Sequence, residues 1–294
     1  MNKDLEQAAK HLGKKSSYTK TYDKNLLVAV DRRTNRESIG YKYRTEHQLP
    51  FIGYDIWNAY EVSFLNKNGF PISGVAKIIY SSQNKTIVES KSLKLYLNSF
   101  NGTKFEDISS VESVISTDLT KLLKTKVEVK IYTEVEKTKE YFEDYIRLEK
   151  IPFLKNIVCS QYSEDRSLLG IKFISPTLLV RKYSSNVLRS NCKITHQPDW
   201  GDAFIYIKGH RIPDEETLLR YLVSFRDENH FHEEVCEAIY YSLWNVFQPE
   251  ELMVCCRYTR RGGISIAPIR ASNEKLLNKD FINVNKFYAK GLRE

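Results

Sequence analysis

Hydrophobic and polar positions alternate with a period of two over much of the first third of the chain. This alternation within residues 54–65 and 72–80 predicts two antiparallel strands with one buried face each. The intervening residues 66–71 contain an Asn-Gly pair, which is typical of a hairpin turn. A shorter apolar run at residues 25–30 predicts a further buried strand.

The hydrophobic period changes after Glu89. Apolar residues from Leu93 to Phe100 are spaced three and four apart, which places them on one face of a helix. A second amphipathic helix is predicted over residues 107–124, and alternation returns at residues 125–132. The first part of the chain is therefore expected to run strand, strand, helix, helix, strand.

The same order of elements recurs in the second half. Strands are predicted first, at 179–183 and on either side of Cys192 at 187–188 and 203–207. Two helices follow at 214–225 and 232–247, and a last strand is predicted at 251–258. Five residues also recur at a constant offset of 125 positions, namely Leu93, Tyr96, Leu97, Ser99 and Phe100 as Leu218, Tyr221, Leu222, Ser224 and Phe225. Two amphipathic helices can share leucines by chance, but the common Tyr-Leu-x-Ser-Phe favours duplication of one unit.

These patterns predict an α+β fold of two tandem modules, each an antiparallel sheet with paired helices packed on one face. The expected boundaries are an N-terminal arm at 1–25, a first module at 26–135, a charged inter-module segment at 136–175 and a second module at 176–294. The arm is polar and rich in lysine, and we expect it to be mobile or loosely docked.

Composition narrows the class of protein. The chain has 294 residues, 41% hydrophobic and 28% charged, and no apolar run approaches the ~20 residues of a membrane span. Five cysteines without metal-ligand spacing, and no apolar core of a signal peptide, predict reduced thiols and a cytoplasmic protein. The net charge of +8 favours an anionic partner, which is either a nucleic acid or a phosphorylated cofactor.

One polar stretch, residues 189–202, contains the candidate nucleophile. Cys192 is flanked by Ser, Asn and Lys, and the carboxylate of Asp199 follows seven residues later. Residues 197–201 are predicted to form a turn, so that a thiol at the end of one strand faces an acid at the start of the next. This arrangement suits a cysteine nucleophile with a separate proton donor. The alternatives are an inert buried thiol and an acid that only caps a strand end.

Other polar groups suggest what the site binds. Glu89 and Glu233 could each accept two N–H bonds from an amidine-like ring edge, although Glu233 also suits the first turn of a helix. No Gly-x-Gly-x-x-Gly follows a strand, so a Rossmann dinucleotide domain is not supported. Lys91, just ahead of a helix, and the segment 260–263, Arg-Arg-Gly-Gly, combine positive charge with accessible amides that suit phosphate.

Four segments, in order along the chain, resemble the QueF nitrile reductases, which are NADPH-dependent 7-cyano-7-deazaguanine reductases of queuosine biosynthesis. They are residues 89–100 (ESKSLKLYLNSF), 190–201 (SNCKITHQPDWG), 231–233 (FHE) and 257–263 (RYTRRGG). The segment 25–36 resembles the leader of the long, two-module form of the family. The chain departs from the family where Ser265 and Ala267 replace the usual Asp and Asn after the glycines.

The resemblance implies tandem tunnelling-fold (T-fold) modules, with sheets joined edge to edge, a ligand between units and at least a homodimer. It also implies reduction of a nitrile to an amine through a thioimide on Cys192, with two hydrides from NADPH and Asp199 as general acid. The residues that it assigns to the substrate are Val88, Glu89, Ser90, His232 and Glu233, and those for NADPH are Ser90, Lys91, Arg261 and Gly262.

Two further hypotheses assign the protein a different function. A cyclohydrolase-type member of the same fold would need a Cys/His zinc site, for which His230 and His232 are close but no further ligand is evident. A basic RNA-binding module would suit the net charge, but the aromatic-rich signature of RNA recognition is absent, so we expect no direct nucleic-acid partner and no membrane. The expected partner is the small-molecule substrate.

Overall fold

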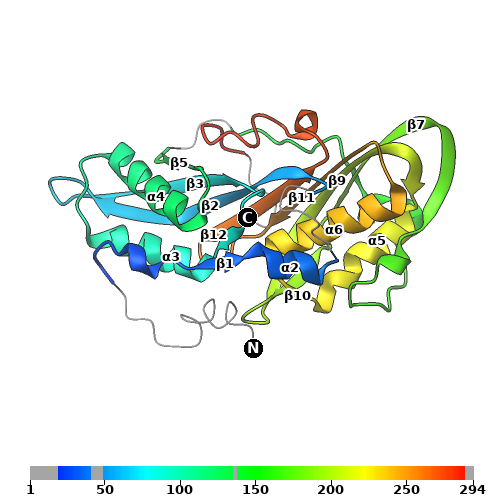
Figure 1. The fold of residues 1–294 in the computed structure, drawn as a ribbon, viewed down its shortest axis with the longest axis horizontal. Helices are drawn as coiled ribbons and strands as arrows, with labels where there is room; N and C mark the ends of the chain where they lie inside the picture. The colour runs from blue at the N-terminus through cyan, green and yellow to red at the C-terminus, as the bar shows by residue number, and fades with distance from the viewer. Residues whose placement is uncertain (1–18, 41–48, 135–137, 289–294) are drawn as a thin grey trace.

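A computed structural model describes residues 19–40, 49–134 and 138–288. Among these residues one ten-stranded sheet runs through both halves of the chain, with strand order β10-β8-β9-β11-β12-β2-β3-β5 and with β7 paired to β9. Figure 1 shows the main helices along one side of this sheet, α3 and α4 over one half and α5 and α6 over the other. The α+β architecture with helices on one face of antiparallel sheets is confirmed.

The first unit has the predicted order of elements. The hairpin of β2 (Ile52–Leu65) and β3 (Pro71–Ser81) continues into β5 (Val127–Tyr132), with a short β4 (Thr86–Val88) leading into the helices. α3 (Ser90–Asn98) and α4 (Ile108–Leu123) pack their apolar faces on the hairpin. Their N-termini are fixed by Glu89 and Asp107, whose carboxylates accept helix amides.

The second unit repeats this plan. It contains β7 (Ile171–Ser185), β8 (Arg189–Cys192), β9 (Pro198–Pro213), α5 (Glu215–Ser224), β10 (Asn229–His230), α6 (His232–Phe247) and β11 (Glu251–Tyr258). The observed bounds of α6 and β11 are those predicted. The strand expected at 187–188 lies at 189–192 instead, because these residues pair with β9 on one side and with β10 on the other.

The duplicated residues occupy equivalent structural positions. The rings of Tyr96 and Phe100 meet edge to face at 5.1 Å, and those of Tyr221 and Phe225 do so at 5.4 Å. The serine before each phenylalanine donates a hydrogen bond to the tyrosine carbonyl, at 2.6 Å in the first unit and 2.7 Å in the second. This agreement supports duplication, and we propose the module boundaries 26–135 and 176–294 on that basis.

The two units are joined by β12 (Ile264–Ala271), a strand that was not predicted. It pairs with β11 of its own unit and with β2 of the first unit, from Ile264 opposite Ala59 to Ala271 opposite Ile52. The strand was not predicted because it contains Pro268 and follows two glycines. Both residue types usually interrupt a central strand, so they obscure the apolar pattern of β12. The expected edge-to-edge joining of the sheets thus occurs within one chain.

The N-terminal region differs from its prediction. In place of one strand at 25–30, residues 24–26 form a short 3-10 helix and β1 (Ala29–Asp31) pairs with β4. Tyr22 is firmly docked, because its ring packs on Phe100 at 5.2 Å and its hydroxyl bonds Asp118 at 2.6 Å. The expectation of a loosely docked arm is therefore wrong for residues 19–25, and the rest of the arm lies outside the described residues.

A buried ionic cluster ties both units to the unpredicted helix α2 (Arg32–Ser38). Arg36 of α2 and Arg270 of β12 pair with Glu237 of α6 at 2.7 and 2.8 Å, and Arg270 and Arg32 also pair with Asp55 of β2. All five side chains are at most 5% exposed. Breaking one pair would leave a buried charge uncompensated at a cost of about 3–5 kcal/mol, so the cluster fixes α6 against the seam.

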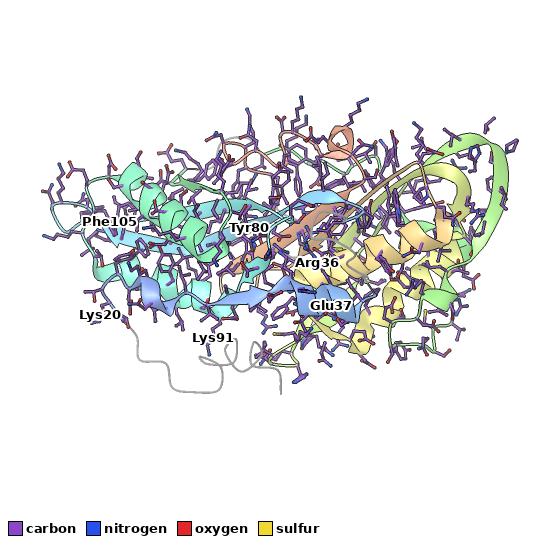
Figure 2. The ribbon with its side chains drawn as sticks, in the orientation of Figure 1. Lys20, Arg36, Glu37, Tyr80, Lys91 and Phe105 are labelled. Carbon is purple, nitrogen blue, oxygen red and sulfur yellow. The ribbon has the colours of Figure 1, made fainter. Side chains whose placement is uncertain are left out.

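In the described part of the chain, the opposite face of the sheet is covered mainly by loops, with the short 3-10 helix η8 (Glu274–Leu276) among them. The ammonium of Lys77, buried on β3, donates to the carbonyls of Phe281, Asn283 and Lys286 at 2.6 to 3.0 Å and so holds the segment after β12 in place. Figure 2 shows side chains filling the space between this segment and the sheet, and between the sheet and the helices.

Candidate active site

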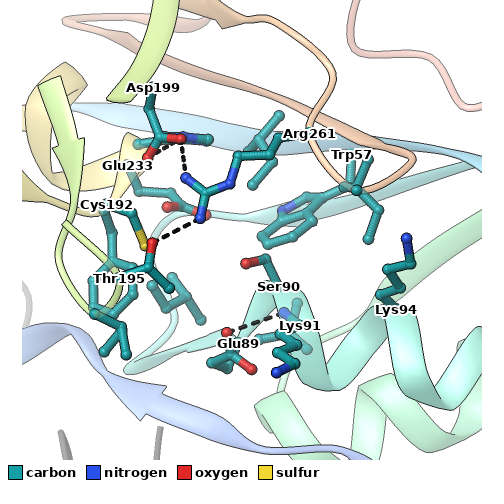
Figure 3. A pocket seen from close by; sticks show the side chains of 18 of the residues that line it. Trp57, Glu89, Ser90, Lys91, Lys94, Cys192, Thr195, Asp199, Glu233 and Arg261 are labelled. Carbon is teal, nitrogen blue, oxygen red and sulfur yellow. Dashed lines mark hydrogen bonds and ion pairs between the residues drawn. The ribbon is translucent and has the colours of Figure 1, made fainter. Parts of the chain in front are cut away.

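A pocket of about 260 Å³ lies at the seam between the two units. The first unit contributes Trp57 and residues 87–91 to its wall. The second unit contributes β8, the start of β9, the start of α6 and the loop before β12. Every residue proposed from sequence for catalysis, substrate or cofactor lines it, namely Val88, Glu89, Ser90, Lys91, Cys192, Asp199, His232, Glu233, Arg261 and Gly262. Figure 3 shows these groups converging from separate elements.

Cys192 is the last residue of β8, and Asp199 is the second residue of β9. The tight turn between them spans residues 193–197, not 197–201 as predicted. Cys192 closes it with two backbone bonds, from its own N–H to Gln197 at 2.8 Å and from the N–H of His196 to its carbonyl at 2.9 Å. His196 takes the left-handed conformation at φ 55°, and the fixed φ of Pro198 suits the first position of a strand.

Asp199 lies between two cationic or potentially cationic groups. Arg261 donates to its Oδ1, and Nε2 of His232 lies 3.3 Å from its Oδ2. Burial favours the neutral acid, but the bonds and charges of His232 and Arg261 outweigh burial and hold the pKa of Asp199 below its usual range. The His232 ring is itself fixed by stacking on Tyr258, with ring centroids 3.8 Å apart. Asp199 is therefore ionised at neutral pH.

Arg261 links the two catalytic candidates. Its guanidinium donates to Asp199 and, through its second nitrogen, to Thr195 at 2.9 Å, and its charge lies near enough to interact electrostatically with Cys192. The arginine begins a turn closed by reciprocal backbone bonds with Ile264, and positive φ angles of 59° at Gly262 and 83° at Gly263 match a type I′ turn.

Glu233 is a buried acid with one unpaired carboxylate oxygen among the described residues. It lies in the first turn of α6 and is 4% exposed, and its Oε1 has no hydrogen-bond partner among the described residues. Burial and the nearby carboxylate of Asp55 together raise the pKa of Glu233 to about 8, although Arg32 and Arg270 oppose them. In the pocket as it stands, Glu233 is therefore mostly neutral at pH 7.

Glu89 and its neighbours form the N-terminus of α3. The carboxylate of Glu89 accepts the amides of Lys91 at 3.0 Å and of Ser92 at 2.7 Å, while burial raises its pKa. Its oxygens thus already cap the helix, which leaves only their remaining lone pairs for a ligand. Ser90 and Lys91 stand at the first helical positions, where amides and positive charge meet.

Sequence analysis missed several residues that line the pocket. Trp57, at 1% exposed, looked like one more core residue of an alternating strand, and its indole N–H has no partner among the described residues. Ile264 and Ile266 line the pocket from the unpredicted strand β12. The residues that depart from the family pattern, Ser265 and Ala267, alternate with these two and do not line the pocket.

No group of three or more His, Cys, Asp or Glu side chains within residues 19–40, 49–134 and 138–288 is placed to hold a metal ion. In the same residues, no helix has both the length and the apolar character needed to cross a membrane.

Comparison with known proteins identifies relatives of both halves. A family model described as nitrile reductase, 7-cyano-7-deazaguanine-reductase N-term, matches residues 18–131, and a QueF-like protein model matches residues 198–276. Together they cover about two thirds of the chain. A solved structure, the archaeosine synthase QueF-Like in the apo form, matches at 17% identity with a TM-score of 0.29, over 33% of this chain and 94% of that chain.

Proposed function

The chain belongs to the QueF family of nitrile reductases, and we propose that it reduces the nitrile of 7-cyano-7-deazaguanine to the aminomethyl group with NADPH. The observation that carries this proposal is the convergence, in one pocket, of a thiol beside a guanidinium, an ionised acid and a buried neutral acid. A nitrile carbon is a weak electrophile, which suits attack by a soft thiolate.

Cys192 acts as the nucleophile. Its sulfur forms a bond to the nitrile carbon, one C–N π bond breaks, and the thiol proton ends on nitrogen to give a thioimide. Because Asp199 is ionised, it first accepts the thiol proton and then donates it to nitrogen. Arg261 is bonded to Asp199 and lies near Cys192, so its charge would stabilise the thiolate as it forms and hold the acid in place.

The cofactor would be held by Ser90, Lys91, Arg261 and Gly262, and the chemistry of these four residues fits that role. The helix N-terminus at Ser90 and Lys91 offers amides and a cation, and the absence of a Cβ at Gly262 lets a ligand approach the backbone closely. When bound, NADPH supplies the hydride for each of two successive two-electron reductions. Between them the nitrogen lone pair re-forms a C=N bond as the C–S bond breaks and the Cys192 thiolate leaves. One further proton from Asp199 or solvent completes the neutral amine, and a second restores the Cys192 thiol.

Glu233 would recognise the guanine-like ring, with Val88, Glu89, Ser90 and His232 completing the substrate contacts. A carboxylate accepts two N–H groups from such an edge in a bidentate contact. The orphaned Oε1 of Glu233 and its position in the pocket support this role.

Substrate affinity is expected to depend on the ionisation of Glu233. With a pKa of about 8 in the empty pocket, the acid must lose a proton to accept two N–H groups, so affinity should rise with pH below 8 and level off above it. The expected slope is about tenfold per pH unit. Calorimetry with Cys192→Ala, which binds but cannot react, measures the dissociation constant from pH 6 to 9.

Glu233→Gln is the matched control for this pH dependence, because the amide keeps the size of the side chain and cannot ionise. Its affinity should be lower and flat with pH. The control is measured as the double variant Cys192→Ala, Glu233→Gln. If the affinity of the single variant Cys192→Ala were also independent of pH, Glu233 would not be the ionising acceptor.

Intact-protein mass spectrometry tests the function directly. Mixing the protein with 7-cyano-7-deazaguanine in the absence of NADPH should add the mass of the nitrile, and peptide mapping should place it on Cys192. Subsequent NADPH should remove the adduct and release the amine. Absence of an adduct on active, reduced protein would overturn the covalent mechanism.

We also propose a cytoplasmic location and a homodimer. All five cysteines are free thiols, which suits a reducing compartment. Strand β7 leaves Phe173, Ile174 and Leu178 at least 40% exposed, and only the short β6 (Ile146–Arg147) pairs with its outer edge in the described part of the chain. An exposed apolar edge of this kind is a suitable surface for a second copy.

A further inference from the structure

A second buried acid, Glu234, follows Glu233 on α6 but has no place in the proposed chemistry. Its side chain is 2% exposed and gathers contacts from four directions. Its oxygens accept the ammonium of Lys193 at 3.0 and 3.1 Å, the backbone N–H of Phe231 at 3.2 Å and the hydroxyl of Ser38 at 3.2 Å. Nδ1 of His230 lies 3.1 Å away. Despite burial, His230 and Lys193 hold the pKa of Glu234 below its usual range.

Lys193 comes directly after Cys192 and is the first residue of the turn that follows the thiol. Its ammonium also contacts Asn35 Oδ1 of α2 at 2.9 Å, and its side chain is only 18% exposed. The ion pair therefore connects the residue next to the nucleophile with the residue next to Glu233. Lys193 directly follows the end of β8, and Glu234 lies in the first turn of α6, so both residues are attached to elements that form the pocket wall.

We infer that Lys193 and Glu234 form a positioning pair, which holds the Cys192 turn against the N-terminus of α6 so that the thiol stays beside Arg261. This inference deepens the proposed function and rests on it. Neither residue lines the pocket, so both act through Cys192 and are not catalytic residues.

The turn is held at several points. Within residues 193–197, the backbone bonds from Cys192 and the contact of His196 with Asn229 at 2.7 Å fix its two ends, Thr195 accepts from Arg261, and Ile194 packs on Val30 and Ile87. The Lys193 side chain adds the ionic tie to α6 and the contact with α2. Removal of Lys193 would leave the buried carboxylate of Glu234 with His230 as its remaining charged neighbour, so a loss of stability is expected beside any change in geometry and the two must be read out separately. Misplacement of a reacting group by about 1 Å costs roughly 100-fold in rate.

Lys193→Met in the full chain tests the pair, because methionine keeps an unbranched side chain and removes the charge. The expected result is a kcat about 30- to 100-fold lower with KM changed less than about threefold. Lys193→Arg should recover most of the rate, since a guanidinium can still pair with Glu234. Lys126→Met is the matched control, because the exposed pair of Lys126 with Glu128 has no link to the site.

The rate at which Cys192 is alkylated reports the position of its thiol relative to Arg261 and does not depend on nitrile reduction. Iodoacetamide should modify Cys192 roughly tenfold more slowly in Lys193→Met than in the wild type, since the thiol leaves Arg261. The partly exposed Cys159 in the same sample serves as the internal reference. A chain without reductase activity would still show this difference, so failure of the positioning pair and failure of the proposed function are distinguishable.

An unchanged kcat and an unchanged alkylation ratio in Lys193→Met would overturn the inference. Equal losses in Lys193→Met and Lys193→Arg, each with a lower melting temperature, would also overturn it, because they would show a structural role alone. Should Lys193→Met fail to fold, Glu234→Gln keeps an acceptor for Phe231 and provides the same comparison.

Discussion

Cys192→Ala is expected to abolish nitrile reduction while leaving substrate binding almost intact. The thiol is the one proposed covalent group in the pocket, and removal of a nucleophile of this kind lowers turnover by roughly 10⁴-fold or more. Glu233, Glu89 and His232 remain in place to hold the ring, so the dissociation constant should change less than about threefold. Steady-state release of the amine and calorimetry measure the two quantities.

Cys159→Ala provides the matched control, because Cys159 is also a free and partly exposed thiol but lies outside the pocket. It should have wild-type turnover. If Cys192→Ala kept more than a hundredth of the wild-type rate, reduction would proceed without the covalent step.

Asp199→Asn is expected to have the second-largest effect, about 10²- to 10⁴-fold on product formation. The amide has the shape of the acid but cannot carry a proton from sulfur to nitrogen. Formation of the thioimide should fall less than product formation, because Arg261 still lies beside Cys192 and favours the thiolate. Rapid-mixing mass spectrometry separates adduct formation from release of the amine.

An equal loss in both steps would show instead that Asp199 mainly positions Arg261 and Cys192. Asp165→Asn controls for the substitution itself, since Asp165 is an exposed cap of a short 3-10 helix and does not line the pocket. We expect it to be without effect on either step.

Sequence periodicity predicted the elements whose buried faces are apolar. α6 and β11 match their predicted bounds because Val235, Ile239 and Leu243 repeat at helical spacing and an unbroken apolar strand follows. The helix α2 was missed for the opposite reason. Its buried side chains are Arg32, Asn35 and Arg36, and the two arginines pair with acids more than 20 residues away in the chain.

The candidate site was predictable only in part. Cys192 and Asp199 stood out as polar residues at strand ends, and the family resemblance added Val88, His232 and Gly262, all of which line the pocket. Trp57 carries no signal that separates it from the core. Lys193 and Glu234 likewise resemble ordinary surface charges, because their pairing depends on the approach of β8 to α6 and not on sequence spacing.

The duplicated units contribute unequally to the seam. At the constant offset of 125, Ser90 and Lys91 of the first unit correspond to Glu215 and Glu216 of the second, so the second helix N-terminus presents acids that would repel a phosphate. Conversely, Cys192 and Asp199 belong to the second unit alone. If the proposed roles hold, each chain has a single reaction centre built from two half-sites, and titration should give one adduct per polypeptide. Such a division of labour makes the two copies mutually dependent, so neither could be lost or replaced separately in evolution without loss of the whole activity.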